Sequence, residues 1–450
     1  MPQMEIAAIF LAYCTNYFLK AEGKLAFVLP RSFFSADHHD NTRSGKAKGM
    51  KLTSVWDLDK VTPLFRIPCG VLFAEKTKVT KKIPVSGIGG KVFTGRIQVH
   101  NCNWKEAQTK LKEENVVWFY TKQGQSSALS TRKVKTNNKT NIYKKLFKNG
   151  ATLYPRAFFF IRLNQEMPPD FIDREVNIKT SELIQTDAKV PWKGLDFAGK
   201  VESHFLYMTA LAKNILPFNL YDPAIIMLPL IIKGKENQKE INLLSGKELM
   251  KKGFLNASRW LQNAENIWDL KKTEKNKNVT LLDCINWQKK LSQQNLNAKY
   301  LVLYNSSAKD ANATVVIRKE LDLEFIVENT TYVLYTDEIK EAYYLTSILN
   351  STAPNKMMKD FQAKGLFGAR HVHKKILDIY YPKYDENNEI HKQLAALSQT
   401  AHTNAALYIE NNPPQQELGA IHLGRLRVAI KKHLATEMGA IDKLVKKIIE

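Results

Sequence analysis

The sequence predicts an α/β protein built from more than one domain. Residues 4–20 carry apolar side chains at three- and four-residue steps, as in an amphipathic helix. Residues 24–30 follow as a nearly continuous apolar run, which is typical of a strand in a sheet covered on both faces. A length of 450 residues with 44% hydrophobic content allows two or three packed cores. We therefore expect a sheet near the N-terminus and at least one further core.

The charge of the chain indicates a polyanionic partner. The 67 lysines and arginines exceed the 44 aspartates and glutamates, which gives a formal net charge of +23 and a pI of about 9.6. Such an excess favours contact with an anionic partner, and ribosomal, membrane-surface and DNA-binding proteins all remain open. The 17 tyrosines and 21 phenylalanines favour a folded protein over a basic tail.

The number and spacing of the cysteines and the hydropathy of the chain predict the cellular compartment of the protein. The chain has four widely separated cysteines without a CxxC pair: Cys14, Cys69, Cys102 and Cys284. We therefore expect no metal site, no disulfide framework and a reducing, cytoplasmic environment. The longest apolar run, residues 225–232, contains Pro229 and is far shorter than a membrane span. Residues 4–19 have no basic stretch before them, so we expect no signal peptide.

The first 80 residues read as parts of one sheet. The helix over residues 4–20 ends before Gly23, where glycine suits a helix C-cap. We expect the strand over residues 24–30 to lie inside its sheet. It places Arg31 at its carboxyl end, the side on which open α/β sheets bind ligands. Residues 52–58 and 70–76 read as two further strands that form an antiparallel hairpin.

The next segment reads as a basic linker. Residues 76–82 are rich in lysine, and the glycines of residues 87–90 predict a flexible turn, because the GxxxxGK[ST] spacing of a phosphate loop is absent. Residues 104–114 read as a charged helix. Residues 124–141 are rich in serine, threonine and lysine, which fits a mobile solvated loop and a DNA-clamping arm equally well.

A second unit begins near residue 149. Residues 158–163 predict a strand from their aromatic content. Residues 300–304, 313–318 and 332–335 predict three more strands. They precede the segment of residues 343–384, around which we expect the chain to be organised.

That segment combines a buried helix with a basic tip. Residues 343–349 have helical apolar spacing, and Asn350 and Ser351 end the helix. The glycines of the tip, Gly365 and Gly368, let backbone approach a partner closely. The basic and imidazole residues around it are Lys364, Arg370, His371, His373, Lys374 and Lys375. Such groups suit phosphate contact, and arginine also reads guanine. A solvated basic loop between core elements is the alternative.

The same segment resembles the target-recognition region of adenine-N6 DNA methyltransferases of the type I and type IIG restriction–modification kind. In that family a LxxILNS helix, a glycine-rich basic loop and a strand ending in proline recur near the C-terminus. The residues that match here are Leu345, Ile348, Leu349, Asn350, Ser351, Gly365, Gly368, Arg370 and Pro382. Residues 390–405 and the IDKLV helix near residue 441 resemble the family's closing helices.

The N-terminal pattern GKLAFVLPRSFF resembles the part of the catalytic domain that follows the family's catalytic motif. Arg43 matches an arginine position after the strand. The resemblance implies the C-terminal portion of a Rossmann-like methyltransferase sheet, then a mixed α+β target-recognition domain and C-terminal helices. The implied boundaries are 1–82, 83–148 for the linker, 149–385 and 386–450. The implied partner is double-stranded DNA, contacted by Arg31, Arg43, Lys364, Gly365, Gly368, Arg370, His371, His373, Lys374 and Lys375.

The family's chemistry is not found in this sequence. Adenine-N6 methylation uses a glycine-rich loop for S-adenosylmethionine and an Asn-Pro-Pro-aromatic motif for the flipped adenine. The run Asn412-Pro413-Pro414-Gln415 ends in glutamine and follows a helix, so we assign no catalytic, cofactor-binding or metal residue. The resemblance then implies S-adenosylmethionine held mainly by a complementary half or subunit. A non-enzymatic DNA- or RNA-binding protein is the alternative.

Overall fold

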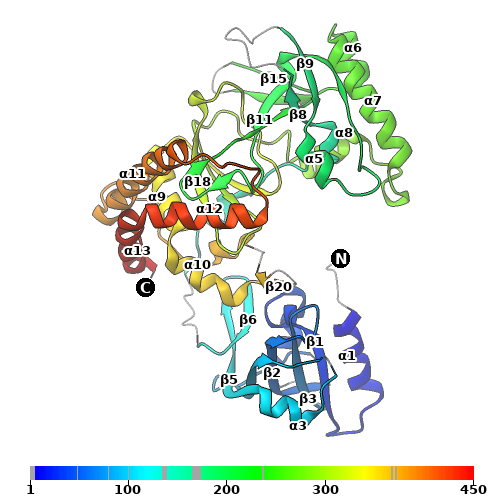
Figure 1. The fold of residues 1–450 in the computed structure, drawn as a ribbon, viewed down its shortest axis with the longest axis vertical. Helices are drawn as coiled ribbons and strands as arrows, with labels where there is room; N and C mark the ends of the chain where they lie inside the picture. The colour runs from blue at the N-terminus through cyan, green and yellow to red at the C-terminus, as the bar shows by residue number, and fades with distance from the viewer. Residues whose placement is uncertain are drawn as a thin grey trace.

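The computed structural model describes residues 6–47, 49–79, 81–99, 101–133, 139–164, 174–235, 238–365, 368–369 and 372–449. Figure 1 shows an N-terminal sheet below a larger body that contains the remaining sheets and the C-terminal helices. The two bodies meet around β6 and β20. In the part of the chain so described, none of the helices combines the length and apolarity needed to cross a membrane.

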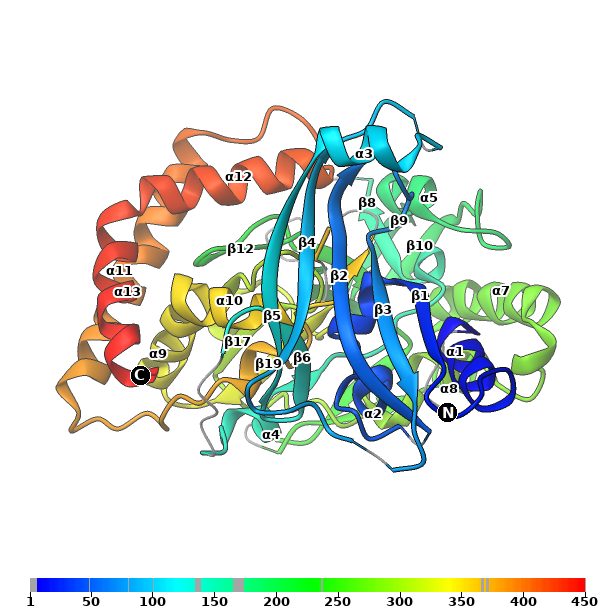
Figure 2. The same cartoon turned by 90° about the horizontal axis from the view of Figure 1, so that it is seen from below.

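The N-terminal body is a six-stranded mixed sheet in the order β1-β3-β2-β4-β5-β6. The pair β2–β4 is parallel and the other neighbours are antiparallel. Its strands are β1 (Lys24–Pro30), β2 (Met50–Thr62), β3 (Cys69–Lys76), β4 (Ile88–Arg96), β5 (Leu111–Gln123) and β6 (Ser126–Ser130). Its helices are α1 (Ile6–Tyr17), η1 (Arg31–Phe34), η2 (Asp37–His39), α2 (Asp40–Arg43) and α3 (Trp104–Lys110). Figure 2 shows the sheet face-on, with α1 beside β1.

The expected hairpin is confirmed, whereas the expected inner position of the first strand is wrong. β2 pairs antiparallel with β3, and β3 pairs with β1, which stands at the edge of the sheet in the part of the chain described. Leu29 is buried, but Val28 is 50% exposed. The apolar run therefore covers one face of an edge strand and does not mark a strand covered on both faces.

The predicted linker of residues 83–148 is also wrong, because β4, β5 and β6 extend the same sheet. The glycines that suggested a flexible turn lie in and beside β4. A Cβ on Gly90 would come within 2.1 Å of the Val55 carbonyl oxygen and 2.6 Å of the Trp118 ring. The Trp118 indole N–H donates to that same carbonyl at 3.0 Å. Gly90 thus makes room for a tryptophan that crosses the neighbouring strand.

A five-stranded antiparallel sheet in the order β10-β9-β8-β14-β11 forms the second core. Its strands are β8 (Phe160–Leu163), β9 (Glu175–Thr180), β10 (Ala198–Glu202), β11 (Leu206–Thr209) and β14 (Ala224–Met227). The helices around it are η3 (Arg156–Phe158), η4 (Ser203–Phe205), α5 (Glu182–Asp187), α6 (Gly246–Lys251), α7 (Leu255–Lys271), η5 (Glu274–Asn276), α8 (Leu281–Ile285) and η6 (Trp287–Lys289). The short hairpin β15 (Leu230–Lys233) and β16 (Glu240–Leu243) completes it.

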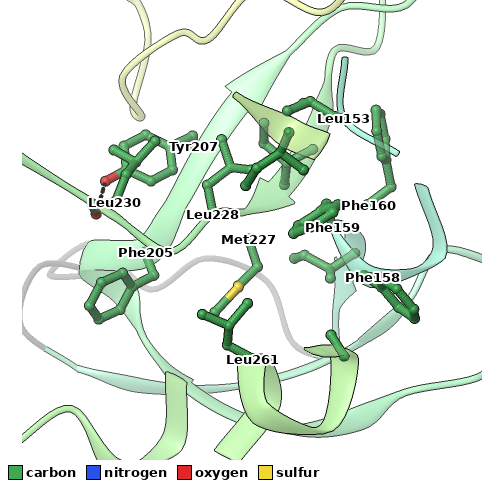
Figure 3. Close-up of a cluster of buried hydrophobic side chains, with 14 of the residues drawn as sticks. Leu153, Phe158, Phe159, Phe160, Phe205, Tyr207, Met227, Leu228, Leu230 and Leu261 are labelled. Atoms are coloured by element: carbon green, nitrogen blue, oxygen red, sulfur yellow. Dashed lines mark hydrogen bonds between the residues drawn. The ribbon is translucent and has the colours of Figure 1, made fainter. Parts of the chain in front are cut away.

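Aromatic side chains fill this core. Figure 3 shows Phe158, Phe159 and Phe160 gathered with Met227 and with Leu261 of α7. The predicted strand over residues 158–163 is therefore present from Phe160 onward, after a 3-10 turn. Three consecutive phenylalanines are all buried because a turn and a strand start place them in one apolar interior.

A four-stranded sheet, β18-β17-β19-β7, carries the C-terminal part. It is formed by β7 (Lys148–Asn149), β17 (Tyr300–Asn305), β18 (Ala313–Ile317) and β19 (Thr331–Thr336), with the β12 (Ile215–Leu216) and β13 (Asn219–Leu220) hairpin nearby. The three strands predicted before residue 343 are thus confirmed. The helices are α4 (Tyr143–Leu146), η7 (Arg318–Glu320), α9 (Ile339–Asn350), α10 (Thr352–Met358), η8 (Lys359–Phe361), η9 (Ile376–Asp378), α11 (Glu389–Asn411), α12 (Ala420–His433) and α13 (Ala435–Ile449).

The LNS end of α9 has a structural role. The Asn350 side chain accepts from the Ala313 N–H at 3.0 Å and donates to the Ala313 carbonyl at 2.8 Å. This amide therefore pairs with the backbone of β18 in place of a further strand, which explains why a fully buried asparagine is stable there. Residues 376–382, where the resemblance implies a strand that ends in proline, instead begin with the 3-10 turn η9. The apolar residues there fill the core without joining a sheet.

Candidate nucleic-acid interface

Much of the predicted basic tip lies at the meeting of the two bodies. β20 (Lys364–Gly365) and β21 (Gly368–Ala369) form a minimal hairpin in which Gly365 pairs with Gly368, and β20 contacts η1 of the N-terminal body. Arg370 and His371 lie outside the described residues. The role predicted for both glycines, close approach of backbone to a partner, stays a prediction.

The remaining three predicted residues at the tip behave differently from one another. His373 is exposed and has a left-handed backbone with φ of 38°. Its N–H donates to the Ser306 carbonyl at 2.9 Å, and its carbonyl accepts from the Tyr304 hydroxyl at 2.7 Å. The tip is therefore anchored to β17, and the imidazole is held on the outside.

The two adjacent lysines face different neighbours. Lys374 Nζ donates to the Lys144 carbonyl at 2.9 Å, and burial together with the charges of Lys148 and Lys144 lowers its pKa. Lys375 has a side chain only 11% exposed, with Nζ 3.4 Å from both the Ser35 carbonyl and an Asp37 carboxylate oxygen. Burial lowers the pKa of Lys375 as well, although Asp37 opposes the shift. Lys375 thus joins the two bodies, whereas Lys374 meets mainly like charge.

Arg31 sits at the carboxyl end of β1, as predicted, but its charge is already paired. Its guanidinium contacts the Asp57 carboxylate through Nε and Nη2 at 2.9–3.1 Å and lies 5.1 Å from the centre of the Phe34 ring. A bidentate arginine–carboxylate pair is among the stronger ion pairs in proteins. The primary role of Arg31 in this structure is to tie η1 to β2.

The prediction that Arg43 contacts DNA is wrong. Its side chain is fully buried and donates to the carbonyls of Phe33 and Ala36 at 2.7 and 3.0 Å and to the Ser127 hydroxyl at 2.7 Å. Burial lowers the pKa of Arg43 to about 10, while Asp40 opposes that shift. The arginine is needed because it satisfies otherwise buried oxygens between α2 and β6.

Sequence reasoning missed the carboxylates that hold the junction. Asp378 accepts from the Ser126 hydroxyl at 2.7 Å and the Gln125 N–H at 3.2 Å, and it forms an ion pair with Lys144. Asp360 accepts from Arg132 at 2.8 Å and from Ser130 at 3.1 Å. In each of these contacts the acid and its partner are more than 200 residues apart in the sequence. A local sequence pattern therefore could not predict the contacts.

The glycine segment of β4 does not fit S-adenosylmethionine. Gly89 and Gly90 are paired strand residues with Val117 and Val116 opposite, so their backbone amides do not form a cradle for an anion or a ribose. Asn412–Gln415 lies in the connection between α11 and α12, away from a strand end. We therefore assign no step of methyl transfer to these segments.

No family model matches the chain, and no curated protein matches it. Several solved structures are similar to the chain. MmeI, a Type IIL restriction-modification enzyme solved in complex with DNA, matches with a TM-score of 0.50 and 12% identity over 98% of this chain and 49% of MmeI. The Type ISP restriction-modification enzyme LlaBIII, bound to DNA, matches 97% of this chain and 34% of its own length with a TM-score of 0.38 and 8% identity.

The likeness to MmeI is one of fold. It runs along nearly the whole chain, whose mixed α/β fold is similar to that of MmeI. The chain spans about half the length of MmeI. The fold does not by itself separate a Rossmann-like portion from a recognition portion, because the six-stranded sheet contains a single parallel pair among its described neighbours.

Proposed function

We propose that this chain is the DNA-recognition portion of a site-specific adenine-N6 DNA methyltransferase of the restriction–modification kind. The observation that carries the proposal is the likeness in fold, over 98% of the chain, to a restriction-modification enzyme in complex with DNA. The net charge of +23 supports a polyanionic partner. S-adenosylmethionine and the Asn-Pro-Pro-aromatic motif belong, in this proposal, to a complementary half that this sequence does not contain.

The surface proposed for that half is α1 together with the free edge of β1. Ile6, Ile9, Tyr13 and Tyr17 recur on one side of α1 and are 83%, 50%, 50% and 74% exposed, whereas Leu11 is buried against the sheet. An edge strand offers unpaired backbone groups, and a contiguous apolar patch beside it is typical of an interaction surface. A complementary half would pair with β1 and cover α1.

Complementation tests the proposal. The purified chain should bind duplex DNA with strong salt dependence and give no S-adenosylmethionine binding by calorimetry. Mixed with an N-terminal half that carries both motifs, it should produce N6-methyladenine in duplex DNA, measured by mass spectrometry of nucleosides.

Three results would contradict it. Micromolar S-adenosylmethionine binding by the chain alone would place a cofactor site here, and methylated cytosine would overturn the substrate. Tight DNA or RNA binding that never supports methylation with any such half would favour a non-enzymatic nucleic-acid-binding protein.

A further inference from the structure

We propose that a lysine-lined hollow between the β5–β6 hairpin and α4 is a seat for backbone phosphates of DNA. The hollow has a volume of about 780 Å³. Three segments distant in sequence line it, and its charged residues are Lys122, Lys139, Lys144, Lys145, Lys374 and Asp378. This inference rests on the proposed DNA binding and deepens it, because Lys122, Lys144 and Lys145 lie outside every segment for which DNA contact was predicted.

The charge of the hollow is strongly positive. Among the eleven described residues that line it, five are lysines and one is acidic. That acid, Asp378, already accepts hydrogen bonds from Ser126 and Gln125 and pairs with Lys144. Its charge therefore holds the hairpin, and lysines outnumber acids among the described lining residues.

Lys374 shows what this imbalance does. Its ammonium donates one hydrogen bond to the Lys144 carbonyl at 2.9 Å, and a lysine has three N–H donors. The nearby charges of Lys144 and Lys148 add to burial in lowering its pKa. A phosphate in the hollow would accept from the remaining donors and reverse the repulsion between the lysines.

The frame of the hollow is rigid. Asn141 donates to the Ile379 carbonyl at 2.8 Å, and the buried Tyr143 donates to Glu341 at 2.9 Å and stacks on Tyr381. Gly124 has a left-handed φ of 55°, and a Cβ there would lie 2.4 Å from Asp378 Oδ1. The hairpin turn and α4 are thus held in position before any ligand arrives, which lowers the entropic cost of binding.

The lining favours the phosphates of a duplex over those of a free nucleotide. Lys122, Lys139 and Lys145 are exposed, so they stand at the rim where a duplex backbone would pass. Among the described lining residues none is aromatic, so a nucleotide base would find no ring on which to stack. Lysines act as point charges toward phosphate, which suits contact that is independent of base sequence.

The test is the salt dependence of duplex binding by the full chain. The triple variant Lys122→Gln, Lys139→Gln, Lys145→Gln should lower the slope of log affinity against log salt by roughly 2–3, since each phosphate contact contributes about 0.9. Binding should weaken about equally for all duplex sequences. The triple Lys→Arg variant at the same positions should keep the wild-type slope. So should Lys251→Gln, Lys252→Gln, Lys275→Gln, because these exposed lysines lie at the end of α6 and in η5, and none of them lines the hollow.

The outcomes separate this site from the proposed function. A wild-type chain that binds no duplex would overturn both. Duplex binding with an unchanged slope in the triple glutamine variant would overturn the phosphate seat alone. Titration with inorganic phosphate and with ATP, without DNA, supplies the other arm: if the triple variant loses that binding but keeps the duplex slope, the hollow serves a free anion and the inference is wrong.

Discussion

The six-stranded sheet has two ends that differ in how they are covered. At the β6 end, called here the sealed end, all five residues of Ser126–Ser130 are buried, and Ser126 and Ser130 donate hydrogen bonds to Asp378 and Asp360 of the C-terminal body. At the β1 end, called the open end, α1 turns a row of large apolar side chains outward. The polar strand β6 is buried because the C-terminal body covers it, whereas the apolar helix α1 is exposed. Amino-acid composition alone therefore does not decide which end of the sheet is buried.

The largest expected effect is at the sealed end. Arg43→Met should lower the free energy of unfolding by about 3–4 kcal/mol, because two carbonyls and the Ser127 hydroxyl lose their charged donor in a buried site and Asp40 loses a nearby positive charge. Chemical denaturation measures it. Arg96→Met, at the exposed end of β4, is the matched control and should change stability by under about 0.5 kcal/mol. Equal stability of the two variants would mean that the sealed end does not depend on Arg43.

Acid should act on a third region, the C-terminal core. His402 donates to the Ser398 carbonyl at 2.7 Å and accepts from the Val315 N–H at 3.1 Å, and burial lowers its pKa to about 4. The unfolded chain, with an ordinary histidine, takes up the proton at higher pH, so stability is lost as pH falls from about 6.5 towards 4. The loss should be about 2 kcal/mol at pH 4, which is less than the full pKa difference implies because residue 402 is only partly shielded from solvent.

A substitution of His402 tests whether this histidine causes the acid dependence of stability. His402→Gln should remove this share of the acid dependence while lowering stability at pH 7. If the acid-unfolding curves of the variant and the wild type have the same slope between pH 4 and 6.5, His402 is not the group that titrates. The comparison of the two sheet ends is best made above pH 6.5, where this effect is absent.

At the open end, substitution should affect association more than folding. Ile9→Ser with Tyr17→Ser should change the stability of the isolated chain by under about 0.5 kcal/mol, because both side chains are already exposed. Affinity for the complementary half should fall about 10-fold or more, since burial of large apolar side chains contributes roughly 1.5–3 kcal/mol each. Isothermal titration with that half measures it, and an unchanged affinity would show that α1 is not the docking face.

The smallest expected effect separates two neighbours at the junction. Lys374→Ala should lower the salt slope of DNA binding by about 0.9 without a large change in stability. Lys375→Ala should leave the slope unchanged and cost roughly 1 kcal/mol of stability, because its ammonium lies between Ser35 and Asp37. A reversed pattern, with Lys375 carrying the salt slope, would mean that the junction opens when DNA binds.

Local sequence patterns were sufficient to predict a helix or strand where one face of that element packs against residues close to it in the sequence. The hairpin of β2 and β3 and the strands β17, β18 and β19 have apolar spacing that matches their burial. The helix predicted over residues 4–20 forms as α1, yet the apolar side chains whose spacing predicted it, among them Ile6, Ile9 and Tyr17, are exposed. Ser126–Ser130 has no such spacing. Its burial depends on Asp360 and Asp378, which lie more than 200 residues further along the chain.

The basic residues also show that the local sequence does not identify the partner of a side chain. Arg31 and Arg43 were predicted to contact DNA from their charge and position, yet one pairs with Asp57 and the other with backbone carbonyls. A positive charge in a sequence does not say whether its counterion is inside the protein or on a partner. Lys122, Lys144 and Lys145 of the hollow were missed for the same reason, because they meet Lys139 and Lys374 only in three dimensions.

The β5–β6 hairpin has a consequence for any chimaera in which the C-terminal body is replaced by that of another chain with this fold. β6 is continuous with the first sheet through its pairing with β5, yet its buried serines fit carboxylates of the C-terminal body. A chimaera joined near residue 82 would break the chain between β3 and β4, so β2 would lose its native neighbour β4 in the sheet. A graft point after Ser130 keeps the sheet whole, provided that the incoming module supplies counterparts of Asp360 and Asp378. The unit of exchange is therefore set by these two acids and not by the change in composition along the chain.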